Sequence, residues 1–257
     1  MIIRSDQMRE FSEAASRSFE DEMVAHLAQF SPPLFNAIKG EQLRLAIRFG
    51  IPRAARYGIT FRGPIRFYLE LMLLFGCHFD TDPQYPWIAE ILKDRIADDQ
   101  MKRASLLYER TRNYRQTVGG PDDQYTLRAL RDISMLARQP LPFSAANLVP
   151  GMLREMSRVY PEKCNYVGED RLKLLIRAGM ATAEAYGFSS DRAVALPVVL
   201  MFAFGHGCFN DLLYPWIAKT VQDRGITDPE GRARRLEKKS STWLDHVLGY
   251  FDRADQT

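Results

Sequence analysis

The amino-acid sequence predicts an all-α fold made of two tandem, structurally similar multi-helix repeats in a pseudo-twofold arrangement. Three observations lead to this prediction. Apolar residues recur every three or four positions along most of the chain, as on one face of an amphipathic helix. Sustained alternation of apolar and polar residues, and the Asn-Gly or Asp-Gly turns of hairpins, are absent from the sequence. Finally, the sequence repeats itself at a distance of 129 residues.

The repeat is clearest between residues 43–95 and residues 172–224, which align without a gap. They share 20 identities in 53 positions, where unrelated segments would share about three. We expect a first repeat over residues 1–116, a linker with a connecting helix over 117–139, and a second repeat over 140–257. The residues kept in both copies form a structural repeat motif: Arg48, Gly50, Tyr57, Gly58 and Trp87 in the first, and Arg177, Gly179, Tyr186, Gly187 and Trp216 in the second.

Five helices are expected in the first copy. An apolar stripe predicts a long helix over residues 8–30, and a second stripe predicts a helix over 43–57 that ends at a glycine. A third begins after Thr60 and is apolar nearly all round, which favours a central position. The fourth begins at Pro86, since proline suits the first helical turn. The fifth covers about residues 99–116.

The same helices are expected in the second copy, where the last one covers residues 229–251. Between the copies, "TVGGPDD" at residues 117–123 has the composition of a linker. An additional helix is predicted after it, over residues 125–139.

Composition and charge exclude several classes of protein. Hydrophobic residues make up 46% and charged residues 26%, which is typical of a globular protein. A net charge of +3, from 35 basic and 32 acidic residues, gives no argument for nucleic acid as a partner. The longest apolar stretch, residues 193–205, is too short to span a membrane, and the N-terminus does not resemble a secretory signal. Three widely spaced cysteines fit free thiols. We therefore expect a cytoplasmic protein.

The segment "FGCHFDTDPQYPW" at residues 75–87 is dense in chemically active side chains, and its counterpart is "FGHGCFNDLLYPW" at residues 204–216. Asp82 persists in the second copy, whereas Asp80 does not. A carboxylate before a proline-initiated helix can accept hydrogen bonds from free N–H groups, so the retained part indicates architecture.

A metal site is the alternative interpretation of this segment. If the two loops meet, Cys77, His78, His206 and Cys208 offer a zinc-compatible set of ligands, although neither pair has the usual ligand spacing. The Asp-Thr-Asp sequence at residues 80–82 resembles a metal-sugar motif but lacks its glycine-rich or strand context. We expect no metal, no cofactor and no catalytic residue.

No motif of a common enzyme class occurs elsewhere in the sequence, which lowers the expectation of an enzyme. The densest basic run is "GRARRLEKK" at residues 231–239, where Arg232, Arg235 and Lys239 share one helix face. A solvated surface explains this pattern, and an acidic protein partner is the alternative. RNA or DNA fits poorly, because no aromatic residues are interleaved.

Residues 2–115 resemble a known family through the segments "IIRSDQM", "FEDEMVAHL", "IRFGIPRAARYGI", "RGPIRFYLELMLLFG" and "FDTDPQYPW". It is a family of small bacterial proteins encoded in type VI secretion effector cassettes, beside VgrG or PAAR spike proteins, adaptors and toxins. The resemblance implies an accessory role and carries no catalytic residue. The second copy departs from the family at "FDTDP", where it reads "CFNDL".

The sequence thus favours a non-enzymatic protein-binding accessory of an effector cassette, a co-chaperone that assists the loading of a toxin effector by its adaptor. A cytoplasmic immunity protein that neutralises a cognate toxin is the first alternative, and a metal-dependent enzyme using the Cys/His/Asp loops is the second. The partner surface is expected on the first copy, with Asp80 exposed beside the turn at residues 76–86 and Asp82 next to it. It is expected to be extended by Arg232, Arg235 and Lys239.

Overall fold

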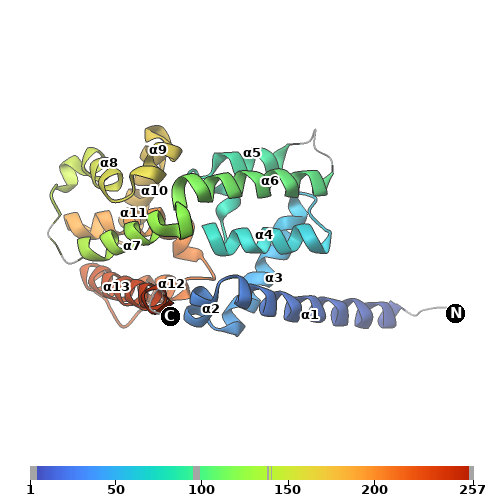
Figure 1. The fold of residues 1–257 in the computed structure, drawn as a ribbon. Coiled ribbons are helices and arrows are strands. Elements are labelled where there is room, and N and C mark those ends of the chain that lie inside the picture. Colours follow the sequence, from blue (N-terminus) through green and yellow to red (C-terminus); the bar gives the residue numbers. More distant parts are fainter. Residues whose placement is uncertain (1–4, 95–98, 138, 140, 255–257) are drawn as a thin grey trace.

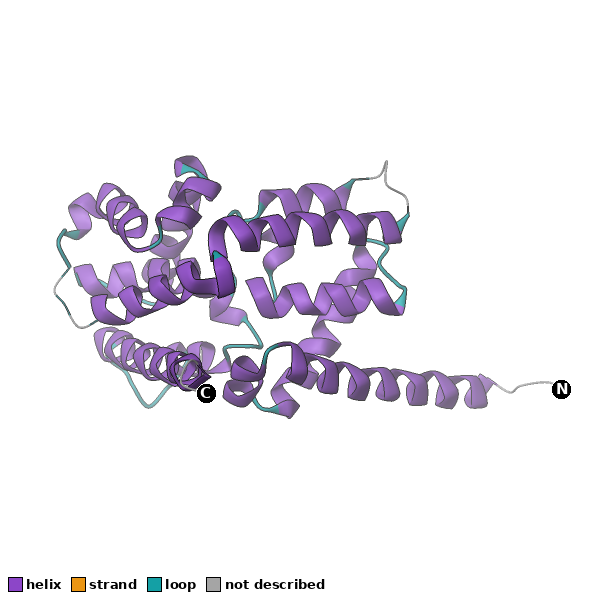
Figure 2. Ribbon diagram, in the orientation of Figure 1, coloured by secondary structure: helices purple, strands orange, loops and turns teal. Residues whose placement is uncertain are grey.

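The computed structural model of the chain describes residues 5–94, 99–137, 139 and 141–254, with side chains for these residues except 5–12 and 145. Every regular element within these ranges is helical, as Figure 2 shows. The all-α prediction is therefore confirmed. No helix in the described part of the chain is both long and apolar enough to cross a membrane.

The first half of the chain contains six α-helices and one short 3₁₀ turn (Figure 1). They are α1 (Ser5–Phe30), α2 (Pro32–Ile38), α3 (Gly40–Arg56), α4 (Arg62–Phe75), η1 (Phe79–Thr81), α5 (Pro86–Lys93) and α6 (Gln100–Tyr114).

A connecting region follows, with η2 (Arg115–Gly119), η3 (Pro121–Asp123) and α7 (Gln124–Leu136). The second half contains η4 (Ala145–Asn147), α8 (Leu148–Val159), α9 (Pro161–Val167), α10 (Glu169–Ala185), α11 (Asp191–Phe204), η5 (Cys208–Asn210), α12 (Pro215–Val221) and α13 (Pro229–Ala254).

The elements of the two halves begin at positions 129 apart. The pairs α2 and α9, α3 and α10, α4 and α11, η1 and η5, α5 and α12, and α6 and α13 all start with this spacing. We call two residues 129 positions apart counterparts. Counterparts also share unusual backbone angles, since Gly76 and Gly205 both have a φ of 92°. The same local folding therefore occurs twice along the chain.

Local sequence explains where these helices start. Proline occupies the first turn of α2, α5, α9 and α12, where its missing N–H costs no hydrogen bond. The carboxylate of Asp99 accepts a hydrogen bond from Met101 N at the start of α6, and its counterpart Asp228 accepts one from Glu230 N at the start of α13. The short helices α2 and α9 are not among the helices expected from the sequence.

The structural repeat motif serves close packing. A Cβ atom on Gly50 would lie 2.5 Å from Met72 Sδ of α4, and one on Gly179 would lie 2.5 Å from a methyl group of Val198 in α11. A side chain at either position would push the paired helices apart.

The two tryptophans of the motif stand in matching places, edge-on to Phe75 and Phe204 at ring distances of 6.4 and 6.2 Å. Trp87 is buried, while Trp216 is only half-buried.

The segment at residues 117–123 is not an exposed linker. The side chain of Val118 is fully buried, and its carbonyl oxygen accepts a hydrogen bond of 3.0 Å from the hydroxyl of Tyr160. One cluster of buried apolar side chains continues through both halves. The connecting region is thus part of the core.

Candidate functional site

The turns at η1 and η5 meet where the two halves join, and a pair of buried carboxylates links them. Asp82 Oδ2 accepts a hydrogen bond of 2.7 Å from His206 N, and its counterpart Asp211 Oδ2 accepts one of 2.7 Å from Cys77 N. Burial is the main reason that the pKa of Asp211 is raised. Asp82 is only 2% exposed. The expectation that Asp82 offers a partner surface is therefore wrong: its carboxylate closes the seam between the halves.

Asp80 is also buried, at 2% exposure, so its predicted exposure is wrong as well. Its carboxylate pairs with the guanidinium of Arg53 and accepts a hydrogen bond of 3.0 Å from the hydroxyl of Tyr57. Burial and then Asp80 raise the pKa of Tyr57 to about 12. In the second half the counterpart Phe209 stacks on Tyr186 at 5.7 Å instead. Asp80 thus holds its turn onto α3.

Of the four candidate metal ligands, the two histidines lie near each other at the seam. The rings of His78 and His206 lie 6.4 Å apart, and the side chains of Cys77 and Cys208 are fully buried. Burial raises the pKa of both thiols and lowers the pKa of His78. Within the described residues, no group of three or more His, Cys, Asp or Glu side chains is arranged to hold a metal ion.

The basic residues of α13 divide between two roles. Arg232 is half-buried and donates a hydrogen bond of 3.4 Å to the carbonyl oxygen of Tyr186, which ties α13 to the end of α10. Arg235 and Lys239 line a surface hollow of ≈ 450 Å³. Only these two of the three predicted residues are placed to meet a partner.

Lys163 is the most unusual titratable group in the described chain. It is 5% exposed and makes no ion pair; its Nζ donates a hydrogen bond of 2.6 Å to the carbonyl oxygen of Phe202 and lies over the Phe202 and Tyr85 rings. Desolvation lowers its pKa to about 8. Because Phe202 lies in the last turn of α11, the ammonium group binds the negative end of that helix. This contact accounts for the position of Lys163 without a ligand.

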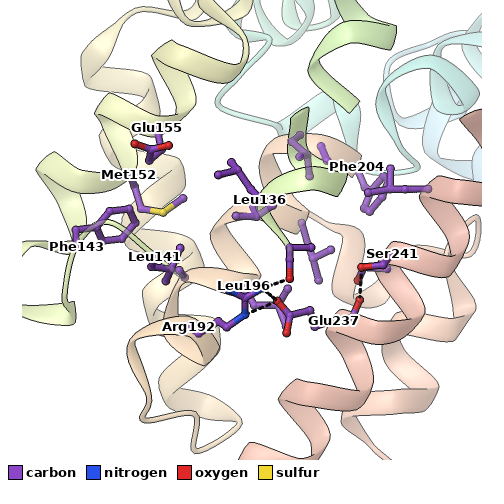
Figure 3. A pocket seen from close by; sticks show the side chains of 18 residues that line it. Leu136, Leu141, Phe143, Met152, Glu155, Arg192, Leu196, Phe204, Glu237 and Ser241 are labelled. Carbon is purple, nitrogen blue, oxygen red and sulfur yellow. Dashed lines mark hydrogen bonds and ion pairs between the residues drawn. The ribbon is translucent and has the colours of Figure 1, made fainter. Parts of the chain in front are cut away.

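In the second half α7 packs against α13 and reduces the groove between α11 and α13 to a hollow of ≈ 80 Å³, which Figure 3 shows from close by. Ile133 and Leu136 of α7 line it together with residues of α11 and α13: Leu196, Val199, Ala203, Ser240, Ser241 and Leu244. Arg192 closes one end, where its guanidinium pairs with Glu237 and donates hydrogen bonds to the carbonyl oxygens of Ala137 and Gln139. We call this place the filled groove.

Within the described residues, no helix equivalent to α7 lies against the corresponding groove between α4 and α6 in the first half, although Phe30 of α1, Gln116 and residues 120–123 line part of it. Its hollow of ≈ 390 Å³ is lined by counterparts of the filled groove: Phe67, Glu70, Leu74, Tyr108, Thr111, Arg112 and Arg115. A second hollow of ≈ 340 Å³ shares Phe67 and Tyr108 and continues toward Gly63 and Met101. We call these two hollows together the open groove.

Apolar side chains of the open groove are exposed to solvent. Tyr108 is 58% exposed, Met101 52% and Leu74 36%. The two hollows adjoin at Phe67 and Tyr108, whose rings lie 5.8 Å apart. Solvent-exposed apolar side chains gathered on one surface are characteristic of a binding site. Since the predicted residues of η1 are buried, the open groove is the best candidate functional site in the described chain.

The sequence contained one signal for the open groove. The additional helix over residues 125–139 was predicted without a partner helix in the first copy. A helix that covers one copy alone leaves the matching surface of the other copy bare. Exposure of Tyr108 or Leu74 itself carries no sequence signature, because apolar residues in helices are usually buried.

Comparison of the chain with protein-family models, with curated proteins and with solved structures finds no match.

Proposed function

We propose that this chain is a non-enzymatic, cytoplasmic protein-binding accessory of a type VI secretion effector cassette, and that it acts as a co-chaperone in loading an effector onto its adaptor. The open groove is the single observation that supports a binding role most strongly. The resemblance of residues 2–115 to cassette-encoded proteins supports the biological setting.

In this proposal the chain is a tandem duplication whose halves face each other about a pseudo-twofold axis. The reciprocal bonds of Asp82 and Asp211 support this arrangement, because each joins one half to the counterpart position of the other. In a duplicated chain, the surface of one half can change while the other half keeps the original surface. The second half covers its groove with α7, and the first half keeps its groove for the partner.

The proposal is tested by co-purifying the full chain with each neighbouring gene product, in wild-type form and as Leu74→Asp. Leu74 lines the open groove, so an aspartate there should abolish capture of the adaptor or effector. Leu106→Asp is the matched control, because Leu106 is 43% exposed on the same helix as Tyr108 but lines neither hollow.

Toxin challenge of cells that lack the gene separates this role from immunity. A co-chaperone is not needed for survival, whereas loss of an immunity protein kills the cell. Capture of a neighbouring protein equally by all three forms would refute the groove as the binding surface.

A further inference from the structure

We propose that the open groove binds one amphipathic α-helix of a partner protein, in the place that α7 occupies in the filled groove. This proposal names the kind of partner for the binding role proposed above, and in that sense it depends on it. The physical argument depends only on the two grooves of this chain.

The filled groove shows what an occupant looks like. Ile133 and Leu136 stand three positions apart on α7, so they lie on one face of that helix, and both line the groove. Ile133 is 8% exposed, and Leu244 of the opposite wall is 3% exposed. Ile133 of α7 is thus buried against this place, while Leu136, Leu196 and Val199 remain partly exposed.

The open groove has the same walls without the occupant. Leu196, Ala203 and Ser240 of the filled groove correspond to Phe67, Leu74 and Thr111. Both walls are helices in each case, and a third helix fits against two parallel ridges of side chains. The shape of the open groove therefore suits a helix, which is a common way in which proteins recognise short segments of a partner.

Charged residues at the edges require the occupant to be amphipathic. Glu70, Arg112 and Arg115 stand where the filled groove has Val199, Ser241 and Leu244. Glu70 is bound to His26 at 2.6 Å, and Arg115 to Asp123 at 2.7 Å. An acyl chain or another wholly apolar ligand would bury these charges at a high cost. A helix with an apolar face and polar flanks leaves them in water.

The two grooves differ at the end where the C-terminus of α7 lies in the filled groove. Arg192 binds the carbonyl oxygens at the C-terminal end of α7, whereas its counterpart is Gly63. A Cβ atom on Gly63 would have no neighbour within 4 Å. The open groove is therefore unblocked there, and the partner helix can extend past the point where α7 ends.

A labelled synthetic peptide of residues 124–137, with blocked ends, is the probe. We expect saturable binding to the full-length protein by fluorescence anisotropy, with a Kd below about 1 mM. Binding should weaken at least tenfold with Leu74→Asp and with Tyr108→Ala, because the first places a charge among the apolar side chains of the open groove and the second removes one of them. A peptide carrying Ile133→Asp and Leu136→Asp should not bind.

Leu106→Asp is the control for the protein, and circular dichroism should show that all variants keep the helical content of the wild type. The proposal is overturned if no binding occurs up to 1 mM, or if both groove variants bind the peptide as the wild type does. It is also overturned if the wild type is a dimer and Leu74→Asp a monomer, since a second copy then covers the groove. If the peptide binds but no neighbouring gene product co-purifies with the chain, the helix-binding groove stands and only the proposed role in an effector cassette is refuted.

Discussion

Replacing Lys163 by leucine removes a charge that the fold holds away from water. Its counterpart Leu34 occupies the third position of α2, as Lys163 does in α9, and is itself buried at 8% exposure. The local structure therefore accepts leucine at this place. The substitution should make the protein more stable at neutral pH, because a buried cation without a carboxylate partner is costly.

The pH dependence gives the magnitude. The pKa of Lys163 falls from 10.5 to about 8 on folding. Below pH 8 the lysine is charged in both states, and the folded state bears the full cost of about 3 kcal/mol. Between pH 8 and pH 10.5 the unfolded chain binds more protons, so wild-type stability rises with pH in this window. The advantage of Lys163→Leu should then shrink by about 2.5 kcal/mol between pH 7 and pH 10.

Urea unfolding followed by circular dichroism at pH 7, 8, 9 and 10 measures this difference. Buried tyrosines titrate in both proteins, so their contribution cancels. Lys238→Leu, at an exposed position of α13, controls for removal of a lysine. An advantage of Lys163→Leu that stays constant from pH 7 to pH 10 would refute the reasoning. A less stable variant at pH 7 would show that the bond to the Phe202 carbonyl outweighs the cost of burial.

Three further predictions concern the stability of variants at glycine-like backbone positions and in the core. Lys39→Gly should raise the free energy of unfolding by about 1 kcal/mol, because Lys39 has a φ of 72° and a ψ of 151°, a region that suits glycine. Its counterpart is Gly168, so the reverse change Gly168→Lys should lower the free energy of unfolding. Denaturant titration of both variants checks the two signs. Gly76→Ala and Gly205→Ala should each lower the melting temperature in a thermal scan. The added Cβ atoms would lie 2.9 Å from the carbonyl oxygen of Phe204 and 2.7 Å from that of Phe75, respectively. An unchanged melting temperature would show that the two turns can move apart without loss of stability. Trp87→Ala should cost about 3–5 kcal/mol in chemical unfolding, and a fully stable variant would show that the surrounding rings close the gap.

Local sequence patterns were sufficient for most of the helices. Periodicity and prolines predicted α1, α3, α5 and α12 to within a few residues, because both act through the backbone of the helix itself. The same rules did not indicate the π-helix at residues 115–119, which follows α6 directly and buries Val118 and Gly119. A buried Val118 in a glycine-rich segment has no local signature.

Long-range contacts explain why the candidate site was misplaced. Asp80 has the sequence context of an exposed turn, and its burial depends on Arg53, which lies on another helix 27 positions earlier. The exposure of Leu74 depends in the same way on the course of α7, far along the chain. The exposure of these two side chains is set by how the whole chain packs, so a local sequence pattern does not predict it.

The exchange of hydrogen bonds at the seam has a consequence for any chain that holds one repeat only. The first half carries both the acceptor Asp82 and the donor Cys77 N, which are the two kinds of group that the seam joins. Two separate copies of it therefore have everything needed to bond each other twice, as a symmetric homodimer does. In the proposed tandem duplication, the connecting region between the halves would keep the second copy at a high effective concentration. In that proposal the two copies need not stay identical, so α7 can pack against the groove of one half while the groove of the other stays open.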